Sequence, residues 1–220
     1  MIVALTREPA ATLGECELTY LERQPVDVAR AAAQHRAYRD ALAHCGARVV
    51  ALPALDALPD SVFVEDTAVV LDELAILTSP GVRSRRAEVP AIEPEIARLR
   101  AVAHVRPPAT LEGGDVLRVG RTLYVGLSPR TNREGVAALS GLAAPHGYAV
   151  KVVPLRGCLH LKTACTLLDE GAILANTDWV DAAEFRDCEV GAVPRDEPQA
   201  GNTLRVGATV CLGASCPRTA

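Results

Sequence analysis

Four stretches of this chain share one pattern, in which a polar residue opens a β-patterned hairpin and a small residue stands thirteen positions later. They are DTAVVLDELAILTS at 66–79, DVLRVGRTLYVGLS at 115–128, TACTLLDEGAILAN at 163–176 and NTLRVGATVCLGAS at 202–215. The opening residues lie 49, 48 and 39 positions apart. Repeats of this period are typical of one supersecondary unit arranged in a ring or array. The pattern therefore predicts equivalent units whose strand starts converge on a common axis.

The segments between the hairpins predict helices and further strands. Residues 25–46 begin with Pro25 and Asp27 and end at Gly46, which are helix start and stop signals. Further helices are expected within 84–102, 131–147 and 181–188, and strands at the start of 48–61 and over 148–155. Each complete unit then reads hairpin, helix, strand, loop. This alternation predicts an α/β fold of residues 1–220 as a single domain, with helices outside small mixed sheets.

Both ends of the sequence fall inside a unit. Residues 1–9, MIVALTREP, match the second half of a hairpin whose first half does not precede them, and the fourth hairpin is followed only by CPRTA at 216–220. A closed ring would need a further segment after Ala220, including a strand beside Ile2–Leu5. The internal symmetry therefore predicts that the last unit is incomplete in this chain.

Composition sets ordinary bounds. The chain has 220 residues, 49% of them apolar and 23% charged, which is typical of a soluble globular protein. A net charge of −4 argues against nucleic acid as a partner. Neither a secretory signal nor an apolar run long enough to span a bilayer is evident, so a cytoplasmic location without a membrane partner is expected. The seven cysteines, without CxxC spacing, are predicted to be small buried hydrophobes in a reducing compartment.

Polar side chains gather at or just before the strand starts of the repeated hairpins. Residues at matching positions of a ring point toward one place, so these carboxylates and one imidazole are expected to share a pocket. Crowded carboxylates repel one another unless a cation neutralises them. The predicted ligand is therefore cationic. The residues concerned are Asp60, Glu65, Asp66, Glu112, Asp115, His160 and Asn202.

Each of these residues also has a purely structural interpretation. The acids could be turn residues in solvated loops, and His160, between Leu159 and Leu161, could be a packed core histidine. Arg85 and Arg130 follow two of the hairpins, where they could bind a ligand carboxylate or form helix-start ion pairs. Together the acids, the histidine and two peripheral arginines fit a zwitterion with a cationic head and a carboxylate tail, such as an arginine-like molecule.

The motifs SVFVEDTAVV, SRRAE, LEGGDVL, SPRTNREG, LHLKTA and the closing CPRT resemble those of dimethylarginine dimethylaminohydrolase (dimethylargininase). That family belongs to the guanidino-group modifying superfamily, with arginine deiminase and the amidinotransferases. The resemblance covers essentially the whole chain in the same motif order. It implies a five-bladed α/β propeller of ββαβ units, the pentein fold, with the last blade incomplete here, and a small-molecule guanidino substrate.

The resemblance also implies roles for individual residues. His160 would be the general acid and base that protonates the leaving amine and activates water, and Glu112 would hold and orient the guanidinium group. The substrate site would be lined by Leu18, Asp60, Glu65, Asp66, Arg85 and Arg130, with the two arginines facing the amino-acid carboxylate. The family uses no metal or organic cofactor. A homodimer is an open alternative to a monomer.

The chain departs from the family in its nucleophile. The family's catalytic cysteine lies in a short Gly-rich segment near the C-terminus, and no such segment is present here. Cys211 lies within a hairpin strand and Cys216 precedes Pro-Arg-Thr, so neither is assigned as the nucleophile. The resulting hypothesis is a hydrolase that converts methylated arginine to citrulline and a methylamine in its complete form. The alternatives are an arginine deiminase-like amidine hydrolase, a catalytically inactive arginine-binding protein, or a fragment.

Overall fold

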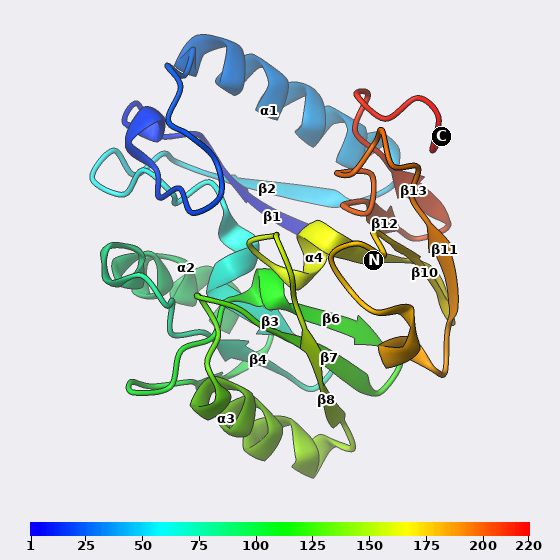
Figure 1. The fold of residues 1–220 in the computed structure, drawn as a ribbon. Coiled ribbons are helices and arrows are strands. Elements are labelled where there is room, and N and C mark those ends of the chain that lie inside the picture. The colour runs from blue at the N-terminus through cyan, green and yellow to red at the C-terminus, as the bar shows by residue number, and fades with distance from the viewer.

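The strands form five small sheets in the computed structural model, which describes all residues 1–220 (Figure 1). Three of the sheets repeat one plan, in which an antiparallel hairpin is followed by a helical segment and a third strand parallel to the second. The predicted α/β alternation is therefore confirmed. The sheets contain, in order of pairing, β1–β2, β3–β4–β5, β6–β7–β8, β9–β10–β11 and β12–β13.

The first sheet has two parallel strands, β1 (Val3–Arg7) and β2 (Arg48–Leu52). After β1 the chain passes through η1 (Leu13–Glu15), and α1 (Val28–His44) then connects it to β2. The side chain of Asp27 accepts a hydrogen bond from the Arg30 amide at 2.9 Å, which satisfies a free N–H at the start of the helix. The predicted helix over 25–46 is confirmed.

The second unit contains the first full copy of the hairpin. Ile92 and Ile96 lie on the buried face of its helix as predicted, whereas Leu99 lies beyond the helix end and is half-exposed. In chain order the unit contains η2 (Val64–Thr67), β3 (Ala68–Val70), β4 (Leu74–Leu77), η3 (Arg83–Ala87), α2 (Glu88–Ala97) and β5 (Ala101–His104).

The third unit has the same order. Its helical segment ends at Gly147, whose φ of 79° is the left-handed conformation that glycine adopts without strain. The unit contains η4 (Gly113–Asp115), β6 (Val116–Val119), β7 (Thr122–Leu127), α3 (Arg133–Ala143), η5 (Ala144–His146) and β8 (Ala149–Pro154).

The fourth unit departs from the sequence-based prediction at three places. Its opening residue Thr163 lies in a helical turn, α4 (Leu161–Ala164), so its hairpin begins later, at β9 (Cys165–Asp169). The hairpin is completed by β10 (Ala172–Ala175), and the predicted helix over 181–188 is the single turn η6 (Ala182–Phe185). A strand that was not predicted, β11 (Glu189–Ala192), then pairs parallel with β10.

The last hairpin returns to the beginning of the chain. It is formed by β12 (Leu204–Val206) and β13 (Thr209–Cys211), and Val206 packs in one hydrophobic cluster with Leu42 of α1 and Ala47. Figure 1 shows β12 and β13 beside the C-terminal end of α1. The first and last sheets are thus neighbours in space although they are far apart in sequence.

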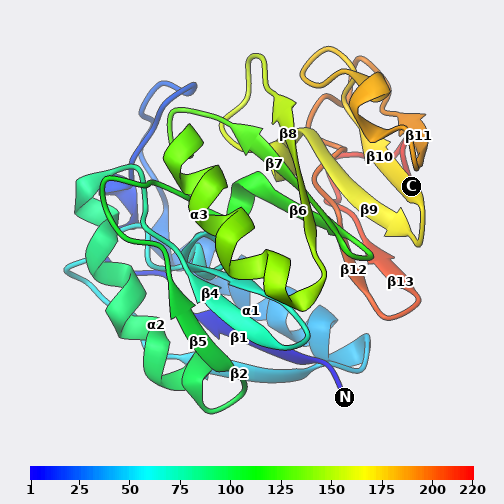
Figure 2. The same cartoon turned by 90° about the horizontal axis from the view of Figure 1, so that it is seen from below.

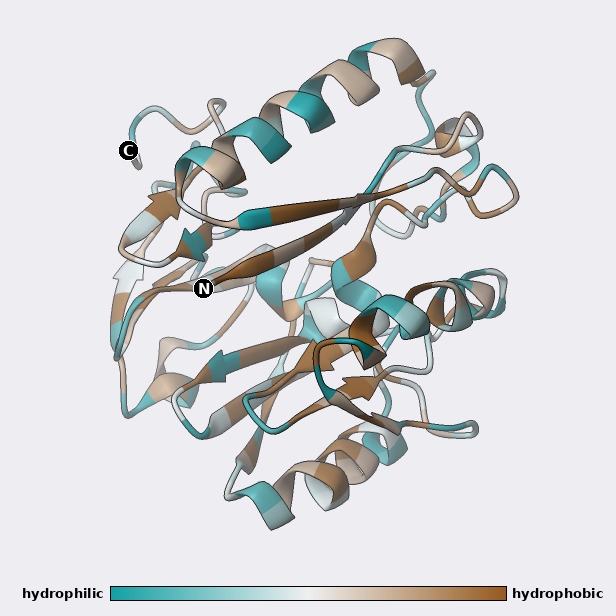
Figure 3. Ribbon diagram, turned by 180° about the vertical axis from the view of Figure 1, so that it is seen from behind, coloured by the Kyte–Doolittle hydropathy of each residue, from teal (hydrophilic) through white to brown (hydrophobic).

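Apolar residues concentrate in the strands and in the helix faces that cover them (Figure 3). The largest hydrophobic cluster lies between the second and third sheets and α3, and it includes Ile76, Leu123 and Leu139. Figure 2 shows α2 and α3 on the outside of the strands that they cover. The helices of the structure are all too short or too polar to cross a bilayer.

Two cysteines 166 positions apart meet at the contact between α1 and the last hairpin, with Cys45 Sγ 3.9 Å from Cys211 Sγ. Oxidised glutathione is expected to join them, forming one S–S bond and releasing two molecules of glutathione. Because the bond would close a long loop, the melting temperature should rise by about 5 °C or more. Peptide mapping without reductant and thermal melting test this, and Cys45→Ser should abolish both effects. A crosslink elsewhere would contradict it.

Candidate active site

A cavity of about 500 Å³ is lined by seven of the eight predicted site residues. These are Leu18, Asp60, Glu65, Asp66, Arg85, Arg130 and His160. The eighth, Glu112, lies behind the cavity wall with none of its surface exposed. The structure therefore brings all eight together from segments that are far apart in the sequence.

Three short helical segments position the central side chains of the site. Asp66 lies in η2, Glu112 immediately precedes η4, and His160 immediately precedes α4. These segments approach closely at Gly114, where a Cβ atom would lie 2.6 Å from Asp66 Oδ1 and 2.9 Å from His160 Cγ. Glycine is required at this position of the LEGGD motif because any side chain would separate the aspartate from the histidine.

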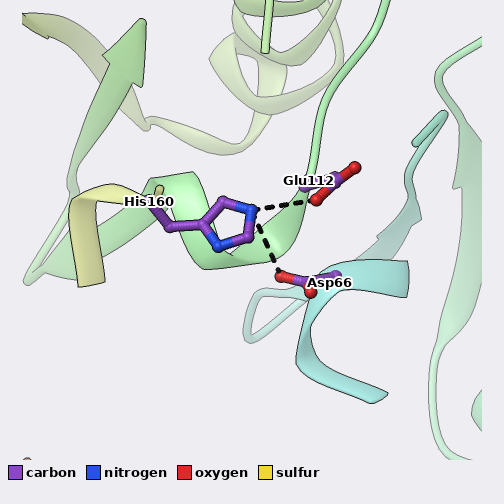
Figure 4. Close-up of side chains that lie close together, drawn as sticks. All are labelled: Asp66, Glu112 and His160. Atoms are coloured by element: carbon purple, nitrogen blue, oxygen red, sulfur yellow. Dashed lines mark hydrogen bonds and ion pairs between the residues drawn. The ribbon is translucent and has the colours of Figure 1, made fainter. Parts of the chain in front are cut away.

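The Nε2 edge of the His160 ring faces two carboxylates (Figure 4). Its Nε2 is 2.9 Å from Glu112 Oε2 and 3.9 Å from Asp66 Oδ1. Burial alone would lower the pKa of this imidazole, but the hydrogen bond to Glu112 and the nearby negative charges outweigh burial, so the pKa is raised above its usual value. The site thus favours the protonated histidine, the form that can give a proton to a leaving group.

Arg85 is buried among carboxylate side chains, which together form an acidic cluster. Its guanidinium contacts both Glu88 oxygens, with Nε–Oε1 at 3.0 Å and Nη2–Oε2 at 2.9 Å, and its Nη1 lies 2.8 Å from Asp66 Oδ2 and 3.5 Å from Glu112 Oε2. Burial raises the pKa of Asp66, but His160 and Arg85 outweigh it, so that this pKa is lowered overall. Asp66 is therefore held as a carboxylate.

Arg130 contacts the other carboxylate oxygen of Glu112, the one that Arg85 does not contact. Its Nη1 is 3.4 Å from Glu112 Oε1, and its Nη2 donates to Thr19 Oγ1 at 3.4 Å, one residue from Leu18. The Gly81 amide also donates to Glu112 Oε1, at 3.1 Å. Glu112 is therefore held by Arg85, Arg130, His160 and a backbone amide.

Acidic side chains outnumber the basic ones in this cluster. The carboxylates are Asp60, Asp66, Glu88 and Glu112, and the guanidinium groups are Arg85 and Arg130. Excess negative charge of this kind is stabilised by a further cation. Asp66, Glu112 and His160 present ligand atoms within 4.8 Å of one another, a spacing that could hold a metal ion. However, the two arginines already contact these carboxylates, so the cluster is better suited to a planar organic cation than to a compact divalent ion.

The remaining predicted residues differ in their exposure. Asp60 accepts from the Glu17 amide at 3.1 Å and 3.2 Å, and burial raises its pKa. The side chain of Glu65 is 60% exposed and pairs with Lys162 at 2.7 Å. Leu18 is 38% exposed on the loop after η1. Leu18 and Glu65 are thus exposed, whereas Asp60 is buried, as are Asp66, Glu112 and His160.

Two details of the predicted pocket were wrong. Asp115 is fully buried and does not line the cavity, because its carboxylate is taken up by hydrogen bonds to protein groups. Arg85 and Arg130 are not peripheral, since both turn inward to the carboxylates. Glu88, which pairs with Arg85, was not predicted as a member of the acidic cluster. Its position three residues after Arg85 at a helix start is the signal that could have found it.

The buried Asp115 should leave a signature in the pH dependence of stability. Burial raises its pKa to about 6. The unfolded chain loses this proton at lower pH, so stability should fall as pH rises from about 4 to about 6, by about 3 kcal/mol in total. Urea unfolding across this range should show that Asp115→Asn lacks this loss. Parallel curves for the wild type and the variant would contradict the assignment.

The cysteine nearest the histidine is not activated as a nucleophile. Cys158 Sγ donates to the backbone oxygen of His160 at 3.5 Å, and burial together with the charge of Asp115 raises the pKa of this thiol to about 11. Cys16, which lines the cavity, also has a raised pKa, mainly through burial. Attack by a thiolate requires the opposite shift.

Comparison with known proteins places the chain in a family. An arginine deiminase family model matches residues 53–192. The N(G),N(G)-dimethylarginine dimethylaminohydrolase of Streptomyces coelicolor is 40% identical over 218 residues, covering 99% of this chain and 84% of that protein. The enzyme of that name from Pseudomonas aeruginosa is 37% identical over 217 residues, covering 98% and 85%.

Solved structures agree. A cysteine-to-serine mutant of the P. aeruginosa protein in complex with citrulline superposes with a TM-score of 0.94 at 36% identity, covering 100% of this chain and 87% of that one. The N-terminal domain of ArgZ, covalently bound to a reaction intermediate, has a TM-score of 0.86 at 19% identity, covering 99% and 86%, and shows a shared fold. The chain therefore belongs to the dimethylarginine dimethylaminohydrolase family of the pentein superfamily, hydrolases that act on amidino carbon–nitrogen bonds.

Proposed function

We propose that this chain carries the substrate site of a dimethylargininase-like hydrolase, which converts Nω-methylated arginine to citrulline and a methylamine. The observation that supports this most strongly is the acidic excess around His160 at the bottom of the cavity. A guanidinium is planar, always charged and matched to carboxylates in shape. Asp66 and Glu112 are the carboxylates that would bind it beside the imidazole.

His160 would act twice in the reaction. A thiolate attacks the guanidinium carbon, and the amine leaves as His160 gives it a proton. The neutral imidazole then takes a proton from water, whose oxygen attacks the same carbon and displaces the thiolate, leaving citrulline. The raised pKa of His160 supports the first step, because the histidine enters it protonated. Glu112, bonded to Nε2, would orient the ring and stabilise its charge.

The two arginines would face the carboxylate of the substrate's amino-acid end. Arg85 has three carboxylates within hydrogen-bonding range, so most of its capacity is already used. Arg130 has longer contacts, 3.4 Å to Glu112 and 3.4 Å to Thr19. We therefore assign Arg130 the larger share of carboxylate binding. Leu18 and Glu65 would contact the exposed part of the ligand, and Asp60 would contact its buried part.

The attacking thiolate would come from outside residues 1–220. We propose that the five sheets are the blades of a five-bladed propeller within one domain, the last of them incomplete, and the plan shared by the three-stranded sheets supports this. The three-stranded sheets each place an antiparallel strand beside their middle strand, and β1 has none. The cavity runs along β1 at Leu5 and Thr6. A strand added at this edge would begin at the cavity, as the hairpin that follows Asp66 does.

A second candidate function is an arginine-binding protein without catalytic activity. It is favoured by the raised thiol pKa values, which include those of Cys16, Cys158 and Cys188. Such a protein would bind dimethylarginine and citrulline through the same carboxylates and release no product.

Calorimetry and a citrulline assay separate these functions. We expect the 220-residue chain to bind Nω,Nω-dimethylarginine, and a chain extended through its natural downstream reading frame to release citrulline from it. Faster turnover of unmethylated arginine would indicate an arginine deiminase-like enzyme. Binding without turnover by an extended chain that contains a new cysteine would indicate the binding protein. Absence of binding by both chains would refute the proposed site.

A further inference from the structure

Asp115 accepts three hydrogen bonds although it lies outside the cavity. Its Oδ1 accepts from the Leu161 amide at 3.0 Å, and its Oδ2 accepts from Ser128 Oγ at 2.6 Å and Thr131 Oγ1 at 2.7 Å. None of its surface is exposed. A buried carboxylate with this many donors is rigidly placed, and it restrains the donors in turn.

Two of the three donors lead directly to the histidine–glutamate pair. Leu161 is the residue after His160, so its amide fixes the backbone that carries the imidazole. Thr131 Oγ1, while donating to Asp115, accepts from the Glu112 amide at 3.1 Å. One carboxylate thus connects the backbones of both members of the pair.

The third donor leads to the arginine. Ser128 Oγ donates to Asp115 and accepts from the Arg130 amide at 3.0 Å and the Thr131 amide at 3.2 Å. This closes the tight turn between residues 128 and 131. The position of Arg130 relative to Glu112 therefore depends on the same carboxylate.

The preceding repeat uses its equivalent aspartate differently. Asp66 opens the hairpin of the second unit as Asp115 opens that of the third, and its Oδ1 likewise accepts an amide of the next unit, from Gly114 at 3.1 Å. Its Oδ2, however, faces the Arg85 guanidinium at 2.8 Å. At Asp115 two hydroxyl groups replace the cation. Of these two equivalent aspartates, Asp66 therefore lines the cavity, whereas Asp115 lies behind the residues that line it.

We propose that Asp115 is a positioning residue, whose single carboxylate holds the backbones of His160, Glu112 and Arg130 in the arrangement in which His160 and Glu112 hydrogen-bond. The role of this arrangement in acid–base chemistry rests on the proposed function. The arrangement itself does not depend on the proposed function, because it follows from contacts within the protein alone.

A negative charge at Asp115 also acts on the imidazole directly. The acids that face His160 are Glu112 at 2.9 Å, Asp66 at 3.9 Å and, from behind the cavity, Asp115. Arg85 opposes them through its pairs with Asp66 and Glu112. Asp115, unlike the other two acids, contacts no guanidinium, so its charge on the imidazole is less compensated.

The test is an NMR titration of the His160 imidazole in the 220-residue chain. Asp115→Asn keeps the side-chain shape and an acceptor for the Leu161 amide, but it removes the charge and the oxygen that accepts from both Ser128 and Thr131. Thr131→Val keeps the charge and cuts the connection to Glu112. Asp72→Asn, an exposed acid paired with Arg118, is the matched control.

We expect the His160 pKa to fall in Asp115→Asn and in Thr131→Val, and to stay at the wild-type value in the control. If Asp115 had only a structural role, its replacement would lower the free energy of unfolding and leave the His160 pKa unchanged. A folded Asp115→Asn with the wild-type His160 pKa would overturn the proposal. Should that variant not fold, Thr131→Val decides in the same way, since an unchanged pKa there would also overturn it.

Binding of Nω,Nω-dimethylarginine, measured in parallel, separates this proposal from the proposed function. If the wild type binds the ligand, Asp115→Asn should bind it several-fold more weakly, although residue 115 does not line the cavity. If the wild type does not bind but the His160 pKa still falls in the variants, Asp115 positions the pair and the proposed function fails.

Discussion

Replacing Arg85 by methionine is expected to lower the free energy of unfolding by about 3–5 kcal/mol, because it leaves Glu88 and Asp66 buried without their cation. A buried carboxylate has a large desolvation cost that is no longer offset once its guanidinium partner is removed. For a chain of this size the melting temperature should fall by about 10 °C. Urea unfolding at neutral pH measures the effect.

Arg98 offers a matched control for this change. It pairs with Glu95 at the same spacing of three residues as Arg85 with Glu88, but its side chain is 71% exposed. Arg98→Met should therefore cost no more than about 1 kcal/mol. In the Arg85→Met background, Glu88→Gln should restore part of the lost stability by removing an unpaired charge. A loss in Arg85→Met no larger than in Arg98→Met would contradict the buried cluster.

Asp66→Asn is expected to weaken binding of Nω,Nω-dimethylarginine about 10- to 100-fold, since it removes a carboxylate proposed to bind the guanidinium. The asparagine oxygen can still accept from the Gly114 amide, so the local backbone should hold. Calorimetry measures the affinity. Asp72→Asn, which removes an exposed carboxylate far from the cavity lining, should bind like the wild type. Equal affinities for both variants would exclude Asp66 from the site.

Much of the fold could be predicted because its signals are local. The hairpins repeat a period that β-strand residues and tight turns define, and α1 is bounded by Asp27 at its start and Gly46 after its end. The short strand β11 was missed because Glu189–Ala192 contains a glycine and an alanine and is largely exposed. Such a segment becomes a strand only because β10 presents a free edge to it.

The site could be predicted as a set of residues but not as a set of contacts. Equivalent positions in repeats indicate that Asp66 and Asp115 lie at equivalent strand starts, but not which way each carboxylate turns. That choice depends on side chains that lie after the hairpin of the same unit, an arginine for Asp66 and two hydroxyl groups for Asp115. The same limit applies to Arg85, whose inward direction is set by Glu88 and by burial.

In the proposed function, a guanidino group binds against Asp66 and Glu112 beside His160. NMR of the His160 imidazole during titration with Nω,Nω-dimethylarginine tests it most directly, because Nε2 lies 2.9 Å from Glu112. We expect saturable shifts of the ring signals in the wild type and much weaker binding in Asp66→Asn. Ring signals that stay unchanged at millimolar ligand in the folded wild-type chain would contradict it.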